Sequence, residues 1–347
     1  MNAAPATANL IRRLALAGFL LCCVVVVLGA YVRLTAAGLG CPDWPGCYGH
    51  FTPTGAQQNP AAQAAFPASP LDVGKAWREM VHRYAAATLG LIIVVITALA
   101  IATRRKRIVP MGHAFALLGI VVVQGMLGML TVTWNLKPLI VTLHLLFGLT
   151  TLGLLWWLYL SLRASAVSRE RFLAPARPTG AWSTVAPRRL VLVALIALGL
   201  QIALGGWTSS NYAAVACPDF PKCQAQWWPE TDYPDAFVLW RGLDINYEGG
   251  VLAHPARVAI HLTHRIGAII ASLALLLAAF SVLRRRSLSH ARVAAISVLI
   301  ALALQLAIGI TMVVEAFPLS FATAHNAGAA LLLLASLALY RQTRRSG

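Results

Sequence analysis

Four histidines lie within long apolar stretches of the sequence: His82, His144, His264 and His325. An ionisable side chain inside such a stretch is costly to bury and is usually functional. Two of the histidines lie in each half of the chain. Two imidazoles that face each other across a helical bundle suit the two axial positions of haem iron. The histidines therefore indicate two haem-binding sites.

Depth within the helices supports this pairing. His144 and His325 follow Pro138 and Pro318, which begin their apolar runs, by six and seven residues. At about 1.5 Å per residue, both lie roughly 10 Å inside the outer end of a helix. The other two histidines enter from the same side at comparable depth. Simple interhelical hydrogen bonding is an alternative, and so is zinc, although no third protein ligand repeats with each pair.

A carboxylate accompanies the first histidine of the first half only. Glu79 lies three residues before His82, so the two side chains share one helix face. At the matching distance before His264 the sequence has His261. A carboxylate beside an iron ligand suits proton transfer or stabilisation of a developing cation. We interpret Glu79 as catalytic and the second half as the carrier of a resident cofactor. The alternative is a rim residue at a helix start.

An arginine directly follows one histidine in each half, as Arg83 and Arg265. Guanidinium groups make charge-assisted hydrogen bonds to carboxylates. Both arginines are therefore candidates for binding haem propionates. The alternative is that they are solvated near the outer rim of the helices.

Two cysteine pairs stand in proline-containing segments outside the apolar stretches, Cys41 with Cys47 and Cys217 with Cys223. Both pairs fall in predicted outer loops, where disulfides can persist. We interpret each pair as a disulfide that staples its loop. A redox or haem-handling role is the alternative.

The composition indicates which elements position these residues. Of the 347 residues, 59% are hydrophobic and 11% are charged, well below the ~25% charge of a soluble domain. Several apolar runs reach the ~20 residues that a membrane-spanning helix needs. We therefore predict an all-α membrane protein. Its eight helices are expected at about residues 14–32, 77–102, 112–132, 139–162, 190–208, 257–283, 291–314 and 319–340.

The charge distribution predicts the orientation in the lipid bilayer. The net charge of +17 comes mainly from arginine clusters in short connections and the C-terminal tail, as expected for cytoplasmic segments. Apart from Glu170, the acidic residues fall in or beside the opposite loops. Both termini are thus predicted to be cytoplasmic and the cysteine loops outside, and no nucleic-acid partner is expected. The first apolar run lacks a convincing cleavage site, so we interpret it as a retained helix.

The two halves form an internal repeat. The cysteine motifs, the histidines and a Gln-x-x-x-Gly motif at Gln124 and Gln305 recur at nearly one sequence offset. Each half holds four predicted helices, so both enter the membrane in the same direction and their pseudo-symmetry axis follows the membrane normal. We predict a four-helix bundle in residues 1–165, a cytoplasmic linker in 166–188 and a second bundle in 189–347.

Glutamines and glycines accompany the histidines. A Gln-x-x-x-Gly motif favours close helix packing with an interhelical hydrogen bond over a cofactor contact; it begins at Gln124, Gln201 and Gln305. Small residues near the histidines are expected to leave room for a flat macrocycle. These are Gly90, Gly148, Gly267 and Gly328.

The chain resembles the haem A synthase family over nearly its whole length. The resemblance is carried by Glu79, His82, Arg83, His144, His264, Arg265, His325, Cys41 and Cys47. Members of that family are eight-helix membrane proteins built from two similar four-helix bundles. They oxidise the C8 methyl group of haem o to the formyl group of haem a, which terminal oxidases use.

The resemblance implies a role for each half. His264 and His325 would ligate a resident haem b, whereas His82 and His144 would hold the substrate haem o beside Glu79. It also implies the bacterial inner membrane, with haem o synthase and oxidase assembly factors as partners, and is compatible with a homo-oligomer. The first cysteine pair is associated with a disulfide in some members. The second is not shared by all and receives no role from the resemblance.

We expect the methyl group to be hydroxylated twice, after which the diol loses water to give the aldehyde. The resident haem would relay electrons between an outside partner and the substrate. The rival hypothesis is a di-haem b membrane cytochrome that passes electrons between quinol and an outer acceptor, and a haem transporter or chaperone is a third. Neither a pure electron carrier nor simple haem binding requires the difference between Glu79 and His261.

Overall fold

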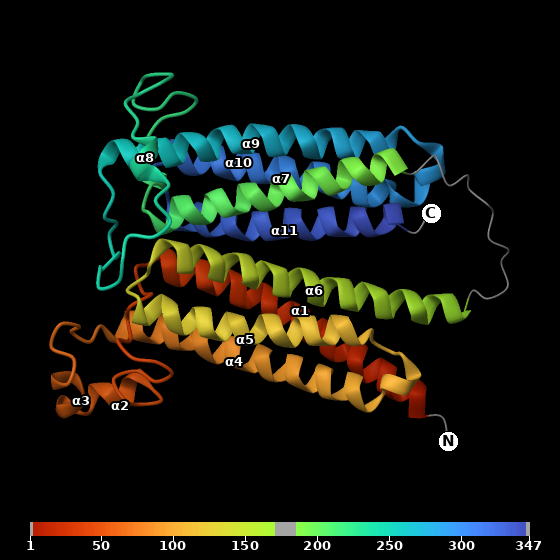
Figure 1. The fold of residues 1–347 in the computed structure, drawn as a ribbon, viewed down its shortest axis with the longest axis horizontal. Coiled ribbons are helices and arrows are strands. Elements are labelled where there is room, and N and C mark those ends of the chain that lie inside the picture. The colour runs from red at the N-terminus through yellow and green to blue at the C-terminus, as the bar shows by residue number, and fades with distance from the viewer. Residues whose placement is uncertain (1–2, 171–184, 345–347) are drawn as a thin grey trace. The chain divides into compact units, whose positions relative to one another are not determined.

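The computed structural model describes residues 3–170 and 185–344, whose long elements are all α-helices (Figure 1). Eight of these helices are long and apolar enough to cross a membrane. The predicted fold class, an all-α membrane protein with eight spanning helices, is therefore confirmed. The helices are α1 (Ala3–Leu34), α4 (Val73–Ala102), α5 (Met111–Thr133), α6 (Pro138–Glu170), α7 (Val185–Ser210), α9 (His254–Leu283), α10 (Arg292–Val314) and α11 (Leu319–Arg344).

Short helices occupy the connections. In the described part of the chain, two follow the first cysteine pair, one precedes α9, and three are 3₁₀ turns. They are α2 (Pro53–Gln57), α3 (Pro60–Ala64), α8 (Tyr233–Ala236), η1 (Arg104–Lys106), η3 (Ala214–Ala216) and η4 (Arg286–Ala291).

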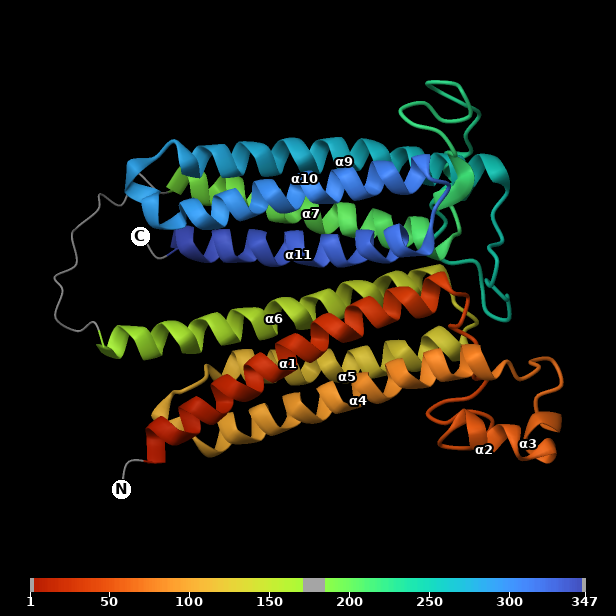
Figure 2. The same cartoon turned by 180° about the vertical axis from the view of Figure 1, so that it is seen from behind.

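The chain divides into two compact units, each with four long helices. In the first unit, α1 and α5 each contact α4 and α6; in the second, α7 and α10 each contact α9 and α11 (Figure 2). The same cyclic order in both units is consistent with the predicted repeat. The first unit also includes residues 240–249. The functional division of the halves stays a prediction, and residues 171–184 of the expected 166–188 linker lie outside the described part.

The tight turns repeat as well. The α5–α6 turn places Asn135 and Leu136 in the left-handed region, with φ of 48° and 60°. The α10–α11 turn does the same with Ala316 and Phe317, with φ of 56° and 62°. This conformation is uncommon for residues other than glycine. Its recurrence at matching positions supports duplication of a whole four-helix unit.

Several helices begin earlier than the sequence predicted, for local reasons. α4 begins at Val73 because the carboxylate of Asp72 accepts a hydrogen bond from the N–H of Lys75, at 2.9 Å, and caps the helix. α9 begins at His254 with Pro255 in its first turn, where a missing N–H costs nothing. The hydropathy pattern placed both helix starts too late in the sequence, because it registers apolar residues and not capping residues.

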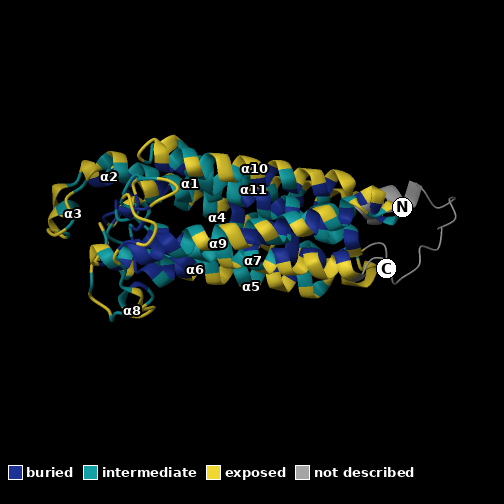
Figure 3. Ribbon diagram, turned by 90° about the horizontal axis from the view of Figure 1, so that it is seen from above, coloured by how far each residue is buried: buried dark blue, intermediate teal, exposed yellow. Residues whose placement is uncertain are grey.

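Apolar side chains remain exposed along the outside of the helices. Leu91, Leu200 and Leu277 are 64%, 64% and 63% exposed, and Figure 3 shows exposed residues along the length of the long helices. Large exposed apolar surfaces mark contact with a partner or a membrane. Together with the eight spanning-length helices, they identify a multi-pass membrane protein.

Candidate functional site

The four histidines lie on four different helices, two in each unit. His82 is on α4 and His144 on α6, whereas His264 is on α9 and His325 on α11. Within each unit the two imidazoles lie within electrostatic range of each other. The structure thus brings together the two pairs named from the sequence.

A glycine of a neighbouring helix lies against each imidazole. A Cβ atom added to any of these glycines would come within 2.9–3.3 Å of the ring carbon Cε1, closer than side chains normally pack. The imidazoles therefore occupy cradles that only glycine leaves open. The pairs are Gly29 with His82, Gly128 with His144, Gly205 with His264, and Gly309 with His325.

The glycines named from the sequence have a different neighbour. Gly148, Gly267 and Gly328 each face the side-chain amide of a glutamine, and Gly90 faces Val121. None of the four lies against an imidazole, and the room that they were expected to leave for a macrocycle stays a prediction. The predicted interhelical hydrogen bonds of the Gln-x-x-x-Gly motifs are confirmed. Each glutamine donates to the backbone carbonyl oxygen of a histidine, at 2.9–3.1 Å; the pairs are Gln124 with His144, Gln201 with His264 and Gln305 with His325. The last glycine of the same motif was the missed signal for three of the four imidazole cradles, those of His144, His264 and His325.

The residues present fit haem as a ligand. Nδ1 of His82 and Nδ1 of His144 are buried and have no hydrogen-bond partner within the described residues. Paired imidazoles between apolar helices, each beside a glycine, match the ligand set of bis-histidine haem. Groups of three or more His, Cys, Asp or Glu that could hold a metal ion do not occur in the described part of the chain.

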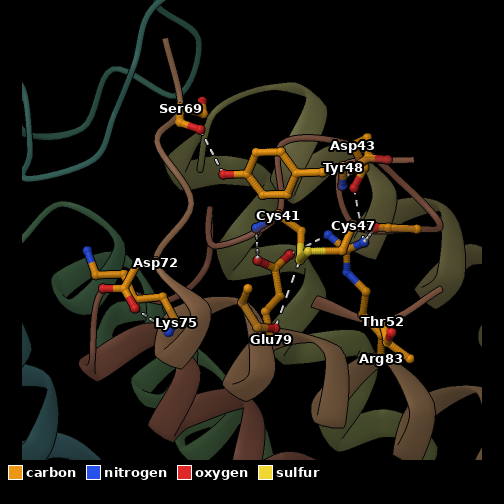
Figure 4. Close-up of a disulfide and its surroundings, with 12 residues drawn as sticks. Cys41, Asp43, Cys47, Tyr48, Thr52, Ser69, Asp72, Lys75, Glu79 and Arg83 are labelled. Carbon is orange, nitrogen blue, oxygen red and sulfur yellow. Dashed lines mark hydrogen bonds and ion pairs between the residues drawn. A yellow bond between two sulfur atoms is a disulfide. The ribbon is translucent and has the colours of Figure 1, made fainter. Parts of the chain in front are cut away.

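Glu79 lies beneath the first disulfide loop (Figure 4) and is only 4% exposed. Its carboxylate accepts a hydrogen bond from the N–H of Cys41 at 2.9 Å and forms an ion pair with Arg83. Arg83 also donates to the carbonyl oxygens of Asp43 and Gly46, at 3.0 and 2.6 Å. Glu79 therefore fastens α4 to the loop in addition to lying one helical turn from an expected iron ligand.

Arg265 has matching partners in the second unit. It donates to the carbonyl oxygens of Lys222 and Asp219, each at 2.8 Å. The propionate contacts expected of Arg83 and Arg265 stay a prediction, since both guanidinium groups here bind the backbone of their outer loops.

The position of Glu79 is taken by His261 in the second unit. His261 is equally buried, at 4% exposure, and its ring lies 6.4 Å from that of Phe317, centre to centre. The two loops are thus held by equivalent arginines, but only in the first does a carboxylate of the spanning helix also bind the loop.

Each outer loop is closed by a disulfide and by an aspartate. The bonds join Cys41 to Cys47 and Cys217 to Cys223, as predicted for loop staples. In the second loop the carboxylate of Asp219 accepts hydrogen bonds from the N–H groups of Gln224 and Ala225, at 2.6 and 2.9 Å. Desolvation acts in the opposite direction, but these N–H groups hold the pKa of Asp219 below its ordinary value.

Residues 240–249, from the second outer loop, pack on the α5–α6 turn of the first unit. Lys137 is 1% exposed, and its Nζ lies 3.3 Å from the ring centre of Trp240 and donates to a carbonyl oxygen of the segment. The N–H of Tyr247 donates to the carbonyl oxygen of Asn135, at 3.0 Å. Burial lowers the pKa of Lys137. No spacing in the sequence indicated this contact, which joins residues 105 positions apart.

Comparison with known proteins relates the chain to one family. A profile of the COX15-CtaA family, described as "Cytochrome oxidase assembly protein", matches residues 12–337. A protein of Shewanella oneidensis named "Heme A synthase" is 43% identical over 312 residues, which cover 90% of each chain. Proteins of the same name are 29% identical in Caulobacter vibrioides, over 92% of each chain, and 27% identical in Rhizorhabdus wittichii, over 90% of this chain and 88% of that protein.

Proposed function

The chain belongs to the COX15-CtaA family of cytochrome oxidase assembly proteins, and we propose that it is a haem A synthase. This oxidoreductase converts the C8 methyl group of haem o to the formyl group of haem a. The observation that carries the proposal is the 43% identity to a protein named Heme A synthase over 90% of both chains. The paired histidines of the two repeated units support it, since they offer one position for a substrate haem and one for a resident haem.

The proposed substrate site lies in the first unit, between His82 and His144, with Glu79 as the catalytic group. Oxidation of a methyl group releases protons and develops positive charge on its carbon. A fixed carboxylate on the helix face of the ligand suits both demands. Cys41 and Arg83 hold the oxygens of Glu79 in place, so the group needs no reorganisation. In each of two hydroxylations the methyl carbon would lose two electrons, through the haem of the second unit, to an outside redox partner, take its oxygen from water and release two protons; the resulting diol would then lose water.

The proposed resident site lies in the second unit, where His264 and His325 would hold haem b. A haem held by two histidines supplies one-electron transfer when bound. The apolar helices exclude water from the pair, and Gly205 and Gly309 fix the space that each imidazole occupies.

The proposed location is the bacterial inner membrane, with both termini cytoplasmic and the disulfide loops outside. The arginine-rich connections support this orientation. Haem o synthase and oxidase assembly factors are the proposed partners, since they would supply the substrate and receive the product.

The decisive experiment is expression of the protein with and without a co-expressed haem o synthase, followed by chromatography of the extracted haems. Haem a, or a hydroxylated derivative of haem o, should appear only when haem o is supplied. An H82A variant is the control, because it should retain haem b in the second unit while losing product.

The same extraction tests the rival function. Two equivalents of haem b, no pigment derived from haem o and a spectrum reducible by quinol would contradict the synthase and identify an electron-transfer cytochrome. Haem b loading without either redox behaviour would identify a haem carrier.

A further inference from the structure

Three of the four histidines rest on a glutamine from a neighbouring helix. The amide nitrogen of Gln201 on α7 lies 3.0 Å from both the carbonyl oxygen and Nδ1 of His264 on α9. Gln305 on α10 lies 3.1 Å from the carbonyl oxygen of His325 and 3.3 Å from either ring nitrogen. Gln124 holds His144 similarly, at 2.9 Å from its carbonyl oxygen and 3.4 Å from Nε2.

Glycines make room for this arrangement on both helices. Four residues after Gln201, Gly205 lies under the imidazole of His264. Three residues after that histidine, Gly267 lies under the glutamine, where a Cβ atom would collide with Oε1 of Gln201. Gly309 and Gly328 serve Gln305 and His325 in the same way. We call each set of glutamine and two glycines a histidine seat.

His82 lacks this seat. At the position on α1 that matches Gln201, the chain has Val25, and Ala85 stands where α9 has Gly267. The glycine under the ring is kept as Gly29. The imidazole of His82 instead lies against the backbone of Val25. The valine and the alanine belong together, because a glycine is needed on α4 only if a glutamine must be accommodated.

In each seat of the second unit the amide nitrogen of the glutamine faces the imidazole, and the amide oxygen Oε1 faces the second glycine. Oε1 of each seat glutamine is buried and has no partner within the described residues. An amide presents an oxygen as well as an NH₂ group, and a half-turn of the amide would let Oε1 accept the ring N–H of a histidine whose other nitrogen is on iron. Such a partner sets the tautomer and orientation of a metal-bound histidine, and its loss typically weakens metal binding 10–100-fold.

We infer that Gln201 and Gln305 are positioning residues that hold the ligands of the resident haem, and that the seatless His82 is the exchangeable ligand through which haem o enters and haem a leaves. This inference rests on the proposed function. An enzyme must release its product, and one loosely held ligand permits release from a bundle whose other ligand, His144, is seated. The resident haem, between two seated ligands, stays through many turnovers.

The test transfers the seat between the halves. In Q201V the second unit receives the valine of the first, and in the double variant V25Q/A85G the first unit receives a seat. V25L is the matched control, since it changes side-chain shape on α1 without adding an amide. Haem loss from each purified full-length protein to apomyoglobin is followed by absorbance, and the identity of the lost haem by chromatography. Electron paramagnetic resonance reports the orientation of the axial imidazoles.

Q201V should lose haem b about tenfold faster or more and show a shifted resonance spectrum, which a packing role alone would not produce. V25Q/A85G should lose haem o and haem a about tenfold more slowly, whereas V25L should match the wild type. Unchanged loss rates and spectra in Q201V, or unchanged release in V25Q/A85G, would overturn the inference. If Q201V does not fold, the release rates of V25Q/A85G alone test the inference. If haem retention changes in these variants but the wild-type protein never forms haem a, the positioning role of the seats is supported and the proposed synthase function is refuted.

Discussion

Replacement of Glu79 by glutamine distinguishes its structural contacts with Cys41 and Arg83 from its proposed catalytic role. Glutamine keeps the shape and can still accept the N–H of Cys41, but it removes the negative charge beside Arg83. Hydrogen bonds to charged groups contribute about 1.5–3 kcal/mol and neutral ones about 1 kcal/mol. The free energy of unfolding should therefore fall by only about 1–2 kcal/mol in E79Q. The disulfide loop should stay attached to α4 through Cys41 and through the carbonyl contacts of Arg83.

The chemical effect should be much larger. A positioned general acid or base contributes typically 10²–10⁴-fold to a rate, so haem a formation by E79Q should fall at least about a hundredfold. Resident haem b should be unaffected, because its proposed ligands lie in the other unit. E79A should lose the same activity and also about 3 kcal/mol of stability, near the lower end for breaking a buried ion pair, since Arg83 keeps its loop carbonyls.

The assay is chromatography of haems extracted from cells that supply haem o, combined with thermal unfolding and haem b content of the purified protein. H261Q is the matched control, because it changes the equivalent position of the second unit and should leave haem a output within a few-fold of the wild type. Haem a production by E79Q at the wild-type rate would refute the catalytic role and leave Glu79 as an anchor only.

Three further outcomes follow from other contacts. G205A should lower the haem b content, because its Cβ would lie 3.1 Å from Cε1 of His264, whereas G199A has open space and should not, as measured by pyridine haemochrome spectra. At pH values above about 3.9, the ordinary pKa of an aspartate, Asp219 should stabilise the second loop, and this stabilisation should disappear as the pH falls through the lowered pKa of Asp219 in the folded protein. Amide exchange near residues 217–226 should therefore become faster over that pH range in the wild type but not in D219N. K137M should speed proteolytic cleavage near residues 240–249, because the cation–π contact with Trp240 and the hydrogen bond to the segment are lost; unchanged digestion would contradict that anchoring role.

The sequence was sufficient for features that depend on composition and spacing. The eight helices follow from runs of apolar residues, and the pairing of His82 with His144 and of His264 with His325 follows from the repeat. The Gln-x-x-x-Gly motifs correctly indicated interhelical hydrogen bonds. These inferences succeed because a membrane helix and its periodicity are local properties of the chain.

Other features depend on contacts between distant segments. The hydrogen bond from Cys41 to Glu79 spans 38 positions and depends on the path of the first loop. The helix starts at Val73 and His254 depend on a capping aspartate and a first-turn proline. The glycines beneath the imidazoles were missed because proximity to histidine in sequence, as for Gly267, is not proximity to the ring.

The inclusion of residues 240–249 in the first unit has a consequence for dissecting the molecule. Trp240 and Tyr247 are encoded after the linker but pack on Lys137 and Asn135, and Tyr247 lines a pocket of ≈ 170 Å³ together with these two residues. Expression of the two halves from a gene divided at the linker would therefore yield an N-terminal fragment that lacks residues 240–249 and a C-terminal fragment in which residues 240–249 lack their binding surface. Residues from the second half of the sequence thus complete the first unit, and we expect fragments divided at the linker to need co-expression for this contact to form.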